Sequence, residues 1–391
     1  MKLTFYSNYF NHHQKALCDC LYKELGKDFT FVETEPIEEF RSKMGWGKEK
    51  IPEYVLKSHE GEEQKEKAYL LGEESDVVVI GTAPEDFIAK RMEEDRLTFR
   101  YSERPLKEGR WKIFVPYLAK KFYINHFSKR KKNIYILAAG AFVSSDYGFL
   151  HSYKGKCYKF GYFPEGELKS FREIENIRSK NKAVRILWAG RFLKLKRADL
   201  LLYAAKRCMD EGFDFRLEFV GDGKEEKHLK KLVKELKLEK KTEFAGFLSP
   251  EDTRREMERA DIFVCTSNKL EGWGSVIYEA LSAGCAVIAS SKAGATPFLI
   301  TQGKTGYIFK SGSIDSLAGK LKILLNSRGA AHELGRNAYI NMQKYWNPEV
   351  AAKRLLKVCE KRLEGEEYFY DKGPLSRAKY IKDTWYKERD I

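Results

Sequence analysis

The chain has 391 residues, of which 43% are hydrophobic and 14% are aromatic. That length suits two domains of ~150 to 200 residues and exceeds what one ordinary core holds. The net charge is +15 and is unevenly placed, because residues 101–200 hold 23 Lys or Arg against 8 Asp or Glu, a surplus equal to that of the whole chain. We therefore expect a basic face for an anionic partner, either phosphate groups or a membrane surface.

Several classes are excluded by what the sequence lacks. No window approaches the ~18 to 20 apolar residues of a membrane-spanning helix, and the opening residues predict a strand rather than a signal peptide. The seven cysteines include no Cys-x-x-Cys pair and no histidine partner at zinc-finger spacing. They are typical of reduced core residues. We expect a soluble, cytoplasmic protein without a metal site.

In the first half, short apolar runs alternate with longer amphipathic stretches, as in helices that cover a mostly parallel sheet. This rhythm predicts an α/β fold. Strands are expected at Lys2–Tyr6, Asp76–Ile80, Leu97–Tyr101 and Asn133–Ala138. Helices are expected at Gln14–Leu25, Pro84–Glu94 and Gly109–Lys129. The polar, charge-dense segment Lys169–Lys182 has no buried period and is predicted to join two domains.

Two polar loops of the first half follow predicted strands. His12 and His13 come after the first strand, and either one contacts a ligand or one of them only caps the following helix. Glu103 and Arg104 follow a later strand and are expected at the same edge of the sheet.

The stretch from Arg110 to Lys132 interleaves aromatic and basic residues. Aromatic residues at this spacing are more often core than membrane anchor, and the lysines are then the solvated face of a helix. A basic, aromatic helix also suits anionic lipid headgroups, so peripheral membrane contact is a second hypothesis.

The second half shows the same alternation of strands and helices. Strands are expected at Val184–Ala189, Arg216–Val220, Thr242–Ala245, Ile262–Thr266, Ala286–Ala289 and Gly306–Phe309. Helices are expected at Ala198–Asp210, Glu225–Lys237, Pro250–Glu258 and Ser275–Ala283. Beyond a Gly373-Pro374 break, a last helix over Leu375–Arg389 is predicted to return to the first domain.

The loops after these strands suit a ligand, because ligands bind beyond the carboxyl ends of parallel strands. Gly190, Arg191 and Lys196 follow the first strand, and their cations suit a diphosphate, although a solvated basic loop is an equal alternative. The turn Gly221–Gly223 lets backbone approach a ligand closely. It is not the dinucleotide fingerprint, since Glu226 stands where a third glycine is required.

The segment Glu271-Gly272-Trp273-Gly274-Ser275 is the strongest motif. Its glycines open a helix whose first amides lack internal partners, and these amides attract phosphate or sugar hydroxyls. Glu271 lies just before the helix, and Glu279 in its second turn suits a ribose diol. The alternative is one acid favoured by the helix dipole and one exposed glutamate, which leaves the glycines unexplained.

Residues 184–345 resemble the donor-binding domain of glycosyltransferase family 4, a group of retaining transferases with the GT-B fold. Two glutamates separated by seven residues, here Glu271 and Glu279, are the family's pattern. Its other matched motifs are Gly190, Arg191 and Lys196; Gly221, Asp222 and Gly223; Phe244, Ala245 and Gly246; and Gly303 and Gly306.

The resemblance implies a GT-B architecture of two Rossmann-like domains facing across a cleft. The expected parts are an acceptor-binding domain (1–170), a nucleotide-sugar-binding domain (171–365) and a C-terminal helix on the first domain (366–391).

The resemblance also implies roles for particular residues. Arg191 and Lys196 would hold the diphosphate and act in catalysis with Glu271. Glu279 would hold the ribose, and Gly246 and Phe247 would lie near the base. The remaining donor-binding positions are Gly190, Gly221, Gly272, Trp273, Gly274 and Ser275, and the acceptor-side candidates are His12, His13, Glu103 and Arg104. Gly294–Phe298 departs from the family pattern by lacking a carboxylate, which leaves the donor-sugar contacts open.

The sequence contains no Asp-x-Asp, so protein cations rather than a metal would neutralise the leaving group. We expect transfer from a UDP-sugar to a saccharide or lipid-linked acceptor with retention, without a cofactor and without a covalent intermediate, either in the cytoplasm or peripheral on the inner face of the plasma membrane. The alternatives are a nucleotide-sugar epimerase or phosphorylase of the same fold and, more distantly, a basic module that binds nucleic acid.

Overall fold

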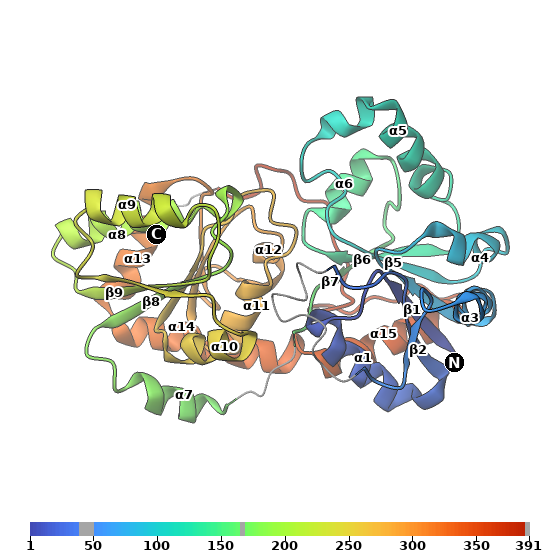
Figure 1. Cartoon of the computed structure of the whole chain (residues 1–391), viewed down its shortest axis with the longest axis horizontal. Coiled ribbons are helices and arrows are strands. Elements are labelled where there is room, and N and C mark those ends of the chain that lie inside the picture. The colour runs from blue at the N-terminus through green and yellow to red at the C-terminus, as the bar shows by residue number, and fades with distance from the viewer. Residues whose placement is uncertain (39–50, 165–168, 388–391) are drawn as a thin grey trace. The chain divides into compact units, whose positions relative to one another are not determined.

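The computed structural model describes residues 1–38, 51–164 and 169–387, which fall into two compact units (Figure 1). The first unit comprises residues 1–165 and 345–382, and the second comprises residues 166–344 and 383–391. Each unit has its own sheet, and every pairing between its strands is parallel. The chain is therefore α/β throughout, as the alternation of apolar runs and amphipathic stretches predicts.

The first unit contains a seven-stranded sheet in the order β3-β2-β1-β4-β5-β6-β7. All five residues of β1 and all four of β4 are buried, because helices cover both faces of a parallel sheet. The strands are β1 (Leu3–Ser7), β2 (Phe29–Glu33), β3 (Val55–Lys57), β4 (Val77–Ile80), β5 (Thr98–Ser102), β6 (Ile134–Ala139) and β7 (Cys157–Phe160).

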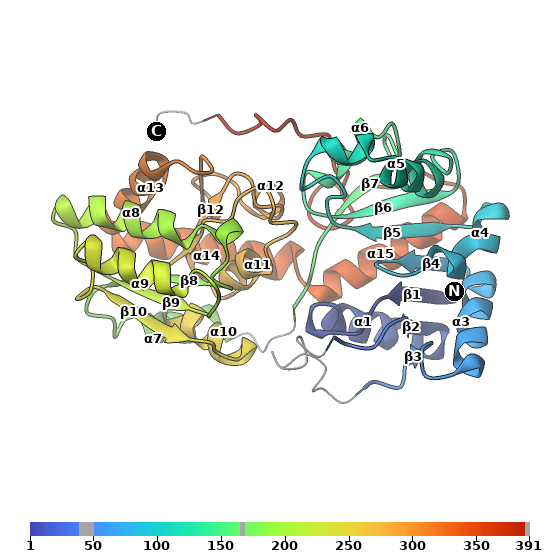
Figure 2. The ribbon, with the colours of Figure 1, turned by 45° about the horizontal axis from the view of Figure 1, so that its top comes forward.

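The helices of the first unit include one from the far end of the chain. Helix α15 lies along α1 in both ribbon views (Figures 1 and 2). The helices are α1 (His12–Leu25), α3 (Glu62–Glu74), α4 (Ala89–Glu93), α5 (Pro116–Phe122), α6 (Val143–Phe149) and α15 (Pro348–Leu363), with shorter turns η1 (Gly26–Asp28), η2 (Glu85–Ile88), η3 (Arg110–Phe114) and η4 (Tyr123–Phe127).

The second unit contains a six-stranded sheet in the order β10-β9-β8-β11-β12-β13. Helices α8, α9 and α13 cover one face, and α7, α10 and α14 lie on the other (Figure 1). The strands are β8 (Val184–Ala189), β9 (Phe215–Val220), β10 (Thr242–Gly246), β11 (Ile262–Cys265), β12 (Ala286–Ser290) and β13 (Tyr307–Phe309). The helices are α7 (Phe171–Arg178), η5 (Lys194–Lys196), α8 (Ala198–Asp210), α9 (Glu226–Glu235), α10 (Pro250–Arg259), α11 (Ser275–Ser282), α12 (Thr296–Leu299), α13 (Ile314–Asn326) and α14 (Arg328–Tyr345).

One helix predicted from the sequence is wrong in extent, and one observed helix was not predicted. The single helix expected over Gly109–Lys129 is divided into η3, α5 and η4. Pro116 causes the first division, since it forces Val115 into an extended conformation with ψ 113° and then occupies the first turn of α5. Conversely, α7 lies within Lys169–Lys182, where a connecting segment without a buried period was expected, and it buries Ile174.

The helix expected over Leu375–Arg389 is absent from the described part of this segment, which ends at residue 387. Its backbone instead bonds to β7: Leu375 N donates to Lys159 O (2.8 Å) and Lys159 N donates to Ser376 O (2.7 Å). Farther along, Trp385 Nε1 donates to Ser291 O in the second unit (3.0 Å). These bonds to other segments replace the internal ladder of a helix.

Across residues 1–38, 51–164 and 169–387, no helix combines the length and the apolar character needed to cross a bilayer.

Candidate active site

The order of the second sheet directs attention to two of its strands. Strands β8 and β11 are neighbours although β9 and β10 separate them in the chain, so the order reverses between them. Ligands of open parallel sheets bind outside the carboxyl ends at such a reversal. The segments that leave β8 and β11 there carry Lys196 and Glu271, two of the residues predicted from the sequence.

Hydrogen bonds join these two segments. Trp188 Nε1, at the end of β8, donates to Thr266 Oγ1 just after β11 (2.9 Å). Thr266 Oγ1 in turn donates to the carbonyl of Lys196 (2.6 Å), and Asn268 N donates to Leu195 O (2.9 Å). The backbone that carries Lys196 is therefore fixed against the loop that leads to Glu271.

Lys196 and Glu271 form an ion pair between Nζ and Oε2 at 2.5 Å. Ser267 Oγ donates to the same carboxylate oxygen (2.9 Å), a contact that the sequence motifs did not indicate. Burial disfavours the charged ammonium, but the attraction and hydrogen bond of Glu271 outweigh burial and raise the pKa of Lys196. Lys196 therefore remains charged at neutral pH.

The other two charged candidates, Arg191 and Glu279, interact electrostatically with Lys196. The positive charge of Arg191 repels that of Lys196, and the Arg191 side chain is exposed. Burial raises the pKa of Glu279 on α11, while the charges of Arg254 and Lys196 lower it in part. Arg191, Lys196, Glu271 and Glu279 thus share one electrostatic neighbourhood within the second unit.

Three glycine-containing turns bring backbone together beside this cluster. Gly190 N donates to Val220 O (3.0 Å), and Gly221 N donates to Gly246 O (2.7 Å). Gly221 has φ +128°, and a Cβ atom there would stand 2.0 Å from Gly190 O. Only glycine fits where two backbone segments approach each other so closely. The ends of β8, β9 and β10 therefore form a rim without side chains, next to the half-exposed ring of Phe247.

The start of α11 is built by a second close contact. Gly274 precedes the helix with φ +94°, and a Cβ on Gly294 would lie 1.8 Å from Gly272 O. Ala295 N donates to Trp273 O (2.9 Å), and the Trp273 side chain is 1% exposed. Gly294–Phe298, which departs from the expected family pattern, thus supports the loop before Ser275. Because the indole of Trp273 is buried, only the backbone of this residue can contact a ligand.

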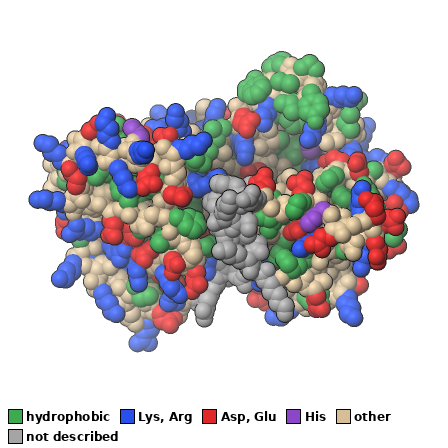
Figure 3. Space-filling model, in the orientation of Figure 1, with side chains coloured by type: hydrophobic (Ala, Val, Ile, Leu, Met, Phe, Trp, Pro, Cys, Tyr) green, Lys and Arg blue, Asp and Glu red, His purple; other side chains and the backbone are tan. Residues whose placement is uncertain are grey.

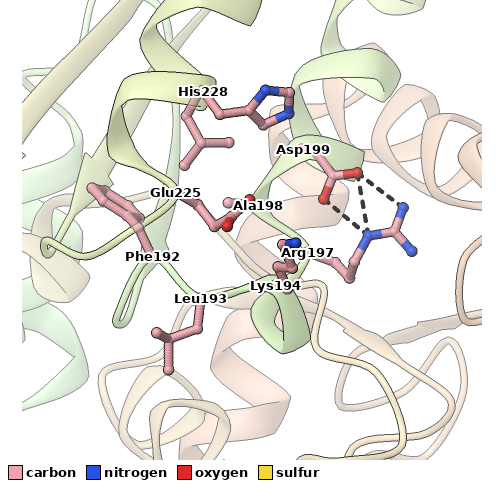
Figure 4. Close-up of a pocket in the computed structure, with 9 residues that line it drawn as sticks. Phe192, Leu193, Lys194, Arg197, Ala198, Asp199, Glu225 and His228 are labelled. Atoms are coloured by element: carbon pink, nitrogen blue, oxygen red, sulfur yellow. Dashed lines mark hydrogen bonds and ion pairs between the residues drawn. The ribbon is translucent and has the colours of Figure 1, made fainter.

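A cavity of about 270 Å³ lies beside the loop after β8 (Figure 4). Its lining includes Phe192, Leu193, Lys194 and His228. At its edge, the guanidinium of Arg197 donates to both carboxylate oxygens of Asp199. None of the predicted site residues lines this cavity, so it is separate from the cluster around Lys196.

In the first unit the strand order reverses between β1 and β4. His12 begins α1 after β1, and Asn11 caps that helix by accepting a bond from His13 N (2.9 Å), so neither histidine is the cap. The ring centres of His12 and His13 are 4.0 Å apart, and the ring centre of His13 is 5.4 Å from that of Tyr162. Tyr162 OH donates to Glu103 (3.0 Å), which gathers His13, Tyr162 and Glu103 into one polar cluster.

Arg104 has different surroundings from the other residues predicted on this side. Its side chain is 9% exposed and donates twice to Asp146, at 2.9 and 3.2 Å. Asp146 also accepts from Leu106 N (3.1 Å), so the pair fixes the loop after β5. The structure thus brings Glu103 to His13 and turns Arg104 toward Asp146.

Residues 1–38, 51–164 and 169–387 contain no cluster of metal-ligating side chains. Within those ranges, no three His, Cys, Asp or Glu side chains are arranged to hold a metal ion. The free cysteines Cys18, Cys157, Cys208, Cys265, Cys285 and Cys359 are buried, and Cys20 is partly exposed.

Comparison with known proteins identifies the second unit. Residues 170–341 match the family described as Glycosyl transferases group 1. Spore coat protein SA of Bacillus subtilis is 29% identical over 211 residues, which cover 51% of this chain and 55% of that protein. Sulfoquinovosyl transferase SQD2 of Arabidopsis thaliana is 31% identical over 163 residues, covering 41% of this chain and 30% of that protein. The chain spans about half or less of the length of these two relatives.

Solved structures extend the likeness to the fold of both units. The structure of Anabaena HepE in complex with UDP has a TM-score of 0.69 at 17% identity, covering 92% of this chain and 100% of that one. Residues 170–341 therefore form a glycosyltransferase group 1 domain, in a chain whose two Rossmann-like units have the GT-B fold.

Proposed function

We propose that this protein is a glycosyltransferase that moves a hexosyl group from a UDP-sugar to a saccharide or lipid-linked acceptor with retention of anomeric configuration. The observation that carries the proposal is the pairing of Lys196 with Glu271 at the reversal of strand order, beside the glycine-opened start of α11. The solved complexes of HepE with UDP and with UDP-glucose support uridine as the base and a sugar nucleotide as the donor.

Charge and backbone in the second unit suit such a donor. Lys196 and Arg191 offer two cations to the diphosphate, and the amides of Gly274 and Ser275 lie at the positive end of α11. The rim formed by Gly190, Gly221 and Gly246 lets a planar base approach backbone. The carboxylate of Glu279 is the acceptor group for ribose hydroxyls.

The chemistry follows from where charge develops. When the glycosidic bond breaks, negative charge grows on the diphosphate, and Arg191 and Lys196 stabilise it in place of a metal ion. Losing one such stabiliser costs ~10²- to 10³-fold in rate. Retention requires the acceptor to attack from the face that the nucleotide leaves, with a phosphate oxygen taking the acceptor proton. No covalent intermediate on the protein is then needed.

For the acceptor, we propose the polar cluster of His13, Tyr162 and Glu103 in the first unit. It combines an imidazole, a phenol and a carboxylate, groups that bond sugar hydroxyls in either direction. His12 is a second candidate because its ring contacts that of His13. The TarM structure solved with UDP and alpha-GlcNAc-glycerol supports an acceptor of this general class. We further propose that the acceptor is reached at an anionic membrane surface.

The test begins with a thermal-shift panel of UDP, GDP, UMP, UDP-glucose and UDP-N-acetylglucosamine. A ligand at 100 times its dissociation constant adds ~2.7 kcal/mol, or about 5 to 11 °C for a unit of this size. We expect UDP and one UDP-sugar to stabilise the protein and UMP to do so weakly. No response to any nucleotide diphosphate would refute the proposal.

Product analysis tests the reaction itself. The anomeric coupling constant of the product is expected to match that of the donor sugar, and inversion would exclude the retaining reaction. Conversion of the donor without an acceptor would indicate an epimerase, and dependence on free phosphate would indicate a phosphorylase.

A further inference from the structure

Large apolar side chains are exposed on the segment that precedes β6. Phe114 is 80% exposed and Tyr117 is 73% exposed, on η3 and α5. Together with Trp111, Tyr123 and Ile124 they form what we call the aromatic patch, which appears as a concentration of hydrophobic side chains over α5 (Figure 3). The sequence favoured a core role for these aromatics, and their exposure reverses that preference. Contiguous exposed apolar surface marks an interaction site.

The segment that carries the patch is anchored along its other side. Lys129 Nζ lies 3.2 Å from Glu85, and the guanidinium of Arg110 stacks 4.2 Å from the centre of the Phe149 ring. His126 is hydrogen-bonded to Tyr153 (3.3 Å), and its burial, with help from the charge of Arg100, lowers its pKa to about 3. The exposed face is thus held outward by a packed inner face.

The charge around the patch has one sign. Residues 110–132 contain eight Lys or Arg and no Asp or Glu. On α5 itself, Lys120 and Lys121 are exposed next to Tyr117 and Tyr123, and over the described ranges neither has a carboxylate within 4 Å. A bound surface that complements this face therefore has to be negatively charged.

We propose that the aromatic patch binds an anionic phospholipid bilayer, with its rings at the level of the headgroups and Lys120 and Lys121 on the lipid phosphates. Trp and Tyr favour this interfacial depth because each has an apolar ring and one polar atom. Lysines extend their apolar stems along the same surface and keep the ammonium in the charged layer. The patch combines the two contributions that membrane association requires, apolar burial and attraction to acidic lipid.

The proposal rests on the proposed function only in explaining how a lipid-linked acceptor is reached, since lipid binding itself needs neither donor nor acceptor. A second copy of the chain or a protein partner fits the rings equally well but gives no reason for the absence of acidic residues across residues 110–132. A nucleic acid fits the charge but gives no reason for the exposed aliphatic side chain of Ile124.

The experiment is co-sedimentation of the full chain with vesicles of phosphatidylcholine alone and of phosphatidylcholine mixed equally with phosphatidylglycerol. One variant combines Phe114→Ala with Tyr117→Ala, and the other combines Lys120→Ser with Lys121→Ser. The matched controls are Tyr380→Ala, at a residue 56% exposed, and Lys227→Ser with Lys234→Ser on α9. Far-UV circular dichroism and cooperative thermal unfolding, measured on every variant, show that each one folds, and stabilisation by UDP is recorded separately.

Wild type is expected to bind the acidic vesicles and not the neutral ones. The lysine variant should lose ~25-fold in partitioning at low salt, about fivefold per charge, and added salt should narrow its difference from wild type. The aromatic variant should lose at least ~10-fold at any salt concentration, because apolar burial is not screened.

Three results would overturn the proposal. The first is equal failure of wild type to bind either vesicle. The second is binding that both variants and both controls leave unchanged. The third is a wild-type dimer, seen by light scattering, that Phe114→Ala with Tyr117→Ala converts to a monomer. A failure of lipid binding with an intact response to UDP would leave the proposed glycosyltransferase standing.

Discussion

Replacing Lys196 by methionine separates the stability that its ion pair contributes from its role toward a ligand. The substitution keeps most of the side-chain volume but removes the cation that faces Glu271, which is 14% exposed, while Ser267 still donates to its carboxylate. Breaking a buried pair from one side costs about 3 kcal/mol, because the remaining charge is uncompensated. For a unit of this size, that loss lowers the melting temperature by about 6 to 12 °C.

Adding Glu271→Gln to Lys196→Met should restore most of this stability, since replacing both charges of a buried pair is close to neutral. Affinity for UDP should not recover. A hydrogen bond from a charged donor contributes ~1.5 to 3 kcal/mol, so its loss weakens UDP binding by roughly 10- to 150-fold. Stability and affinity are thus expected to diverge in the double variant.

The assays are thermal unfolding by circular dichroism and titration calorimetry with UDP, on both single variants and on the double variant. Lys230→Met is the control, because Lys230 pairs with Glu226 at 2.6 Å on the exposed surface of α9, where such a pair contributes under ~0.5 kcal/mol. Wild-type affinity for UDP in the double variant would refute the assignment of Lys196 to the diphosphate. Unchanged stability in Lys196→Met would refute the energetic argument.

Three further predictions test other parts of the two units. Gly221→Ala should abolish stabilisation by UDP, because its Cβ would stand 2.0 Å from a carbonyl, whereas Gly212→Ala, at φ +87° in open space, should cost only about 1 to 2 kcal/mol of stability. Affinity for UDP should fall on acidification at a higher pH than an ordinary glutamate would give, because the pKa of Glu279 is raised, and titrations with Glu279→Gln should lose this dependence. Glu85→Gln should lower the free energy of unfolding by ~3 kcal/mol near pH 7, measured by chemical denaturation, because it leaves buried Arg100 without its carboxylate. Burial opposes ionisation of Glu85, but Arg100 and Lys129 outweigh burial and lower its pKa to about 2. The difference in stability from wild type should therefore shrink as the pH falls from 4.5 toward 2.

The elements of the second half were predictable because they are regular. Strand β8 and helix α8 have the predicted bounds, since Val184–Ala189 is a short apolar run that ends at a glycine and Ala198–Asp210 repeats its apolar residues at helical spacing. The first half is less regular. Strand β2 (Phe29–Glu33) was not predicted, because it ends in a glutamate. That glutamate is buried and accepts a hydrogen bond from Phe10 N (2.8 Å).

The candidate site was predictable in its residue types and not in its contacts. The glycines and glutamates of 271–279 indicate a helix start with two acids, but Lys196 is 75 positions before Glu271, and only the order of strands in the sheet brings the two together. Ser267 and Tyr162 belong to no motif, and local periodicity carries no information about them. The aromatic patch was misread for a related reason, since spacing alone does not say which face of a segment is covered.

The path of the chain through its two units decides where the protein can be truncated and where its units can be exchanged. Helix α15 packs on α1, at the opposite end of the sequence, and the residues after it bond to β7. A fragment that stops near residue 344 would leave α1 uncovered and would be prone to degradation. Exchange of the second unit with that of a related protein accordingly needs three junctions, near residues 165, 345 and 383, because the second unit takes in both 166–344 and the residues from 383 onward.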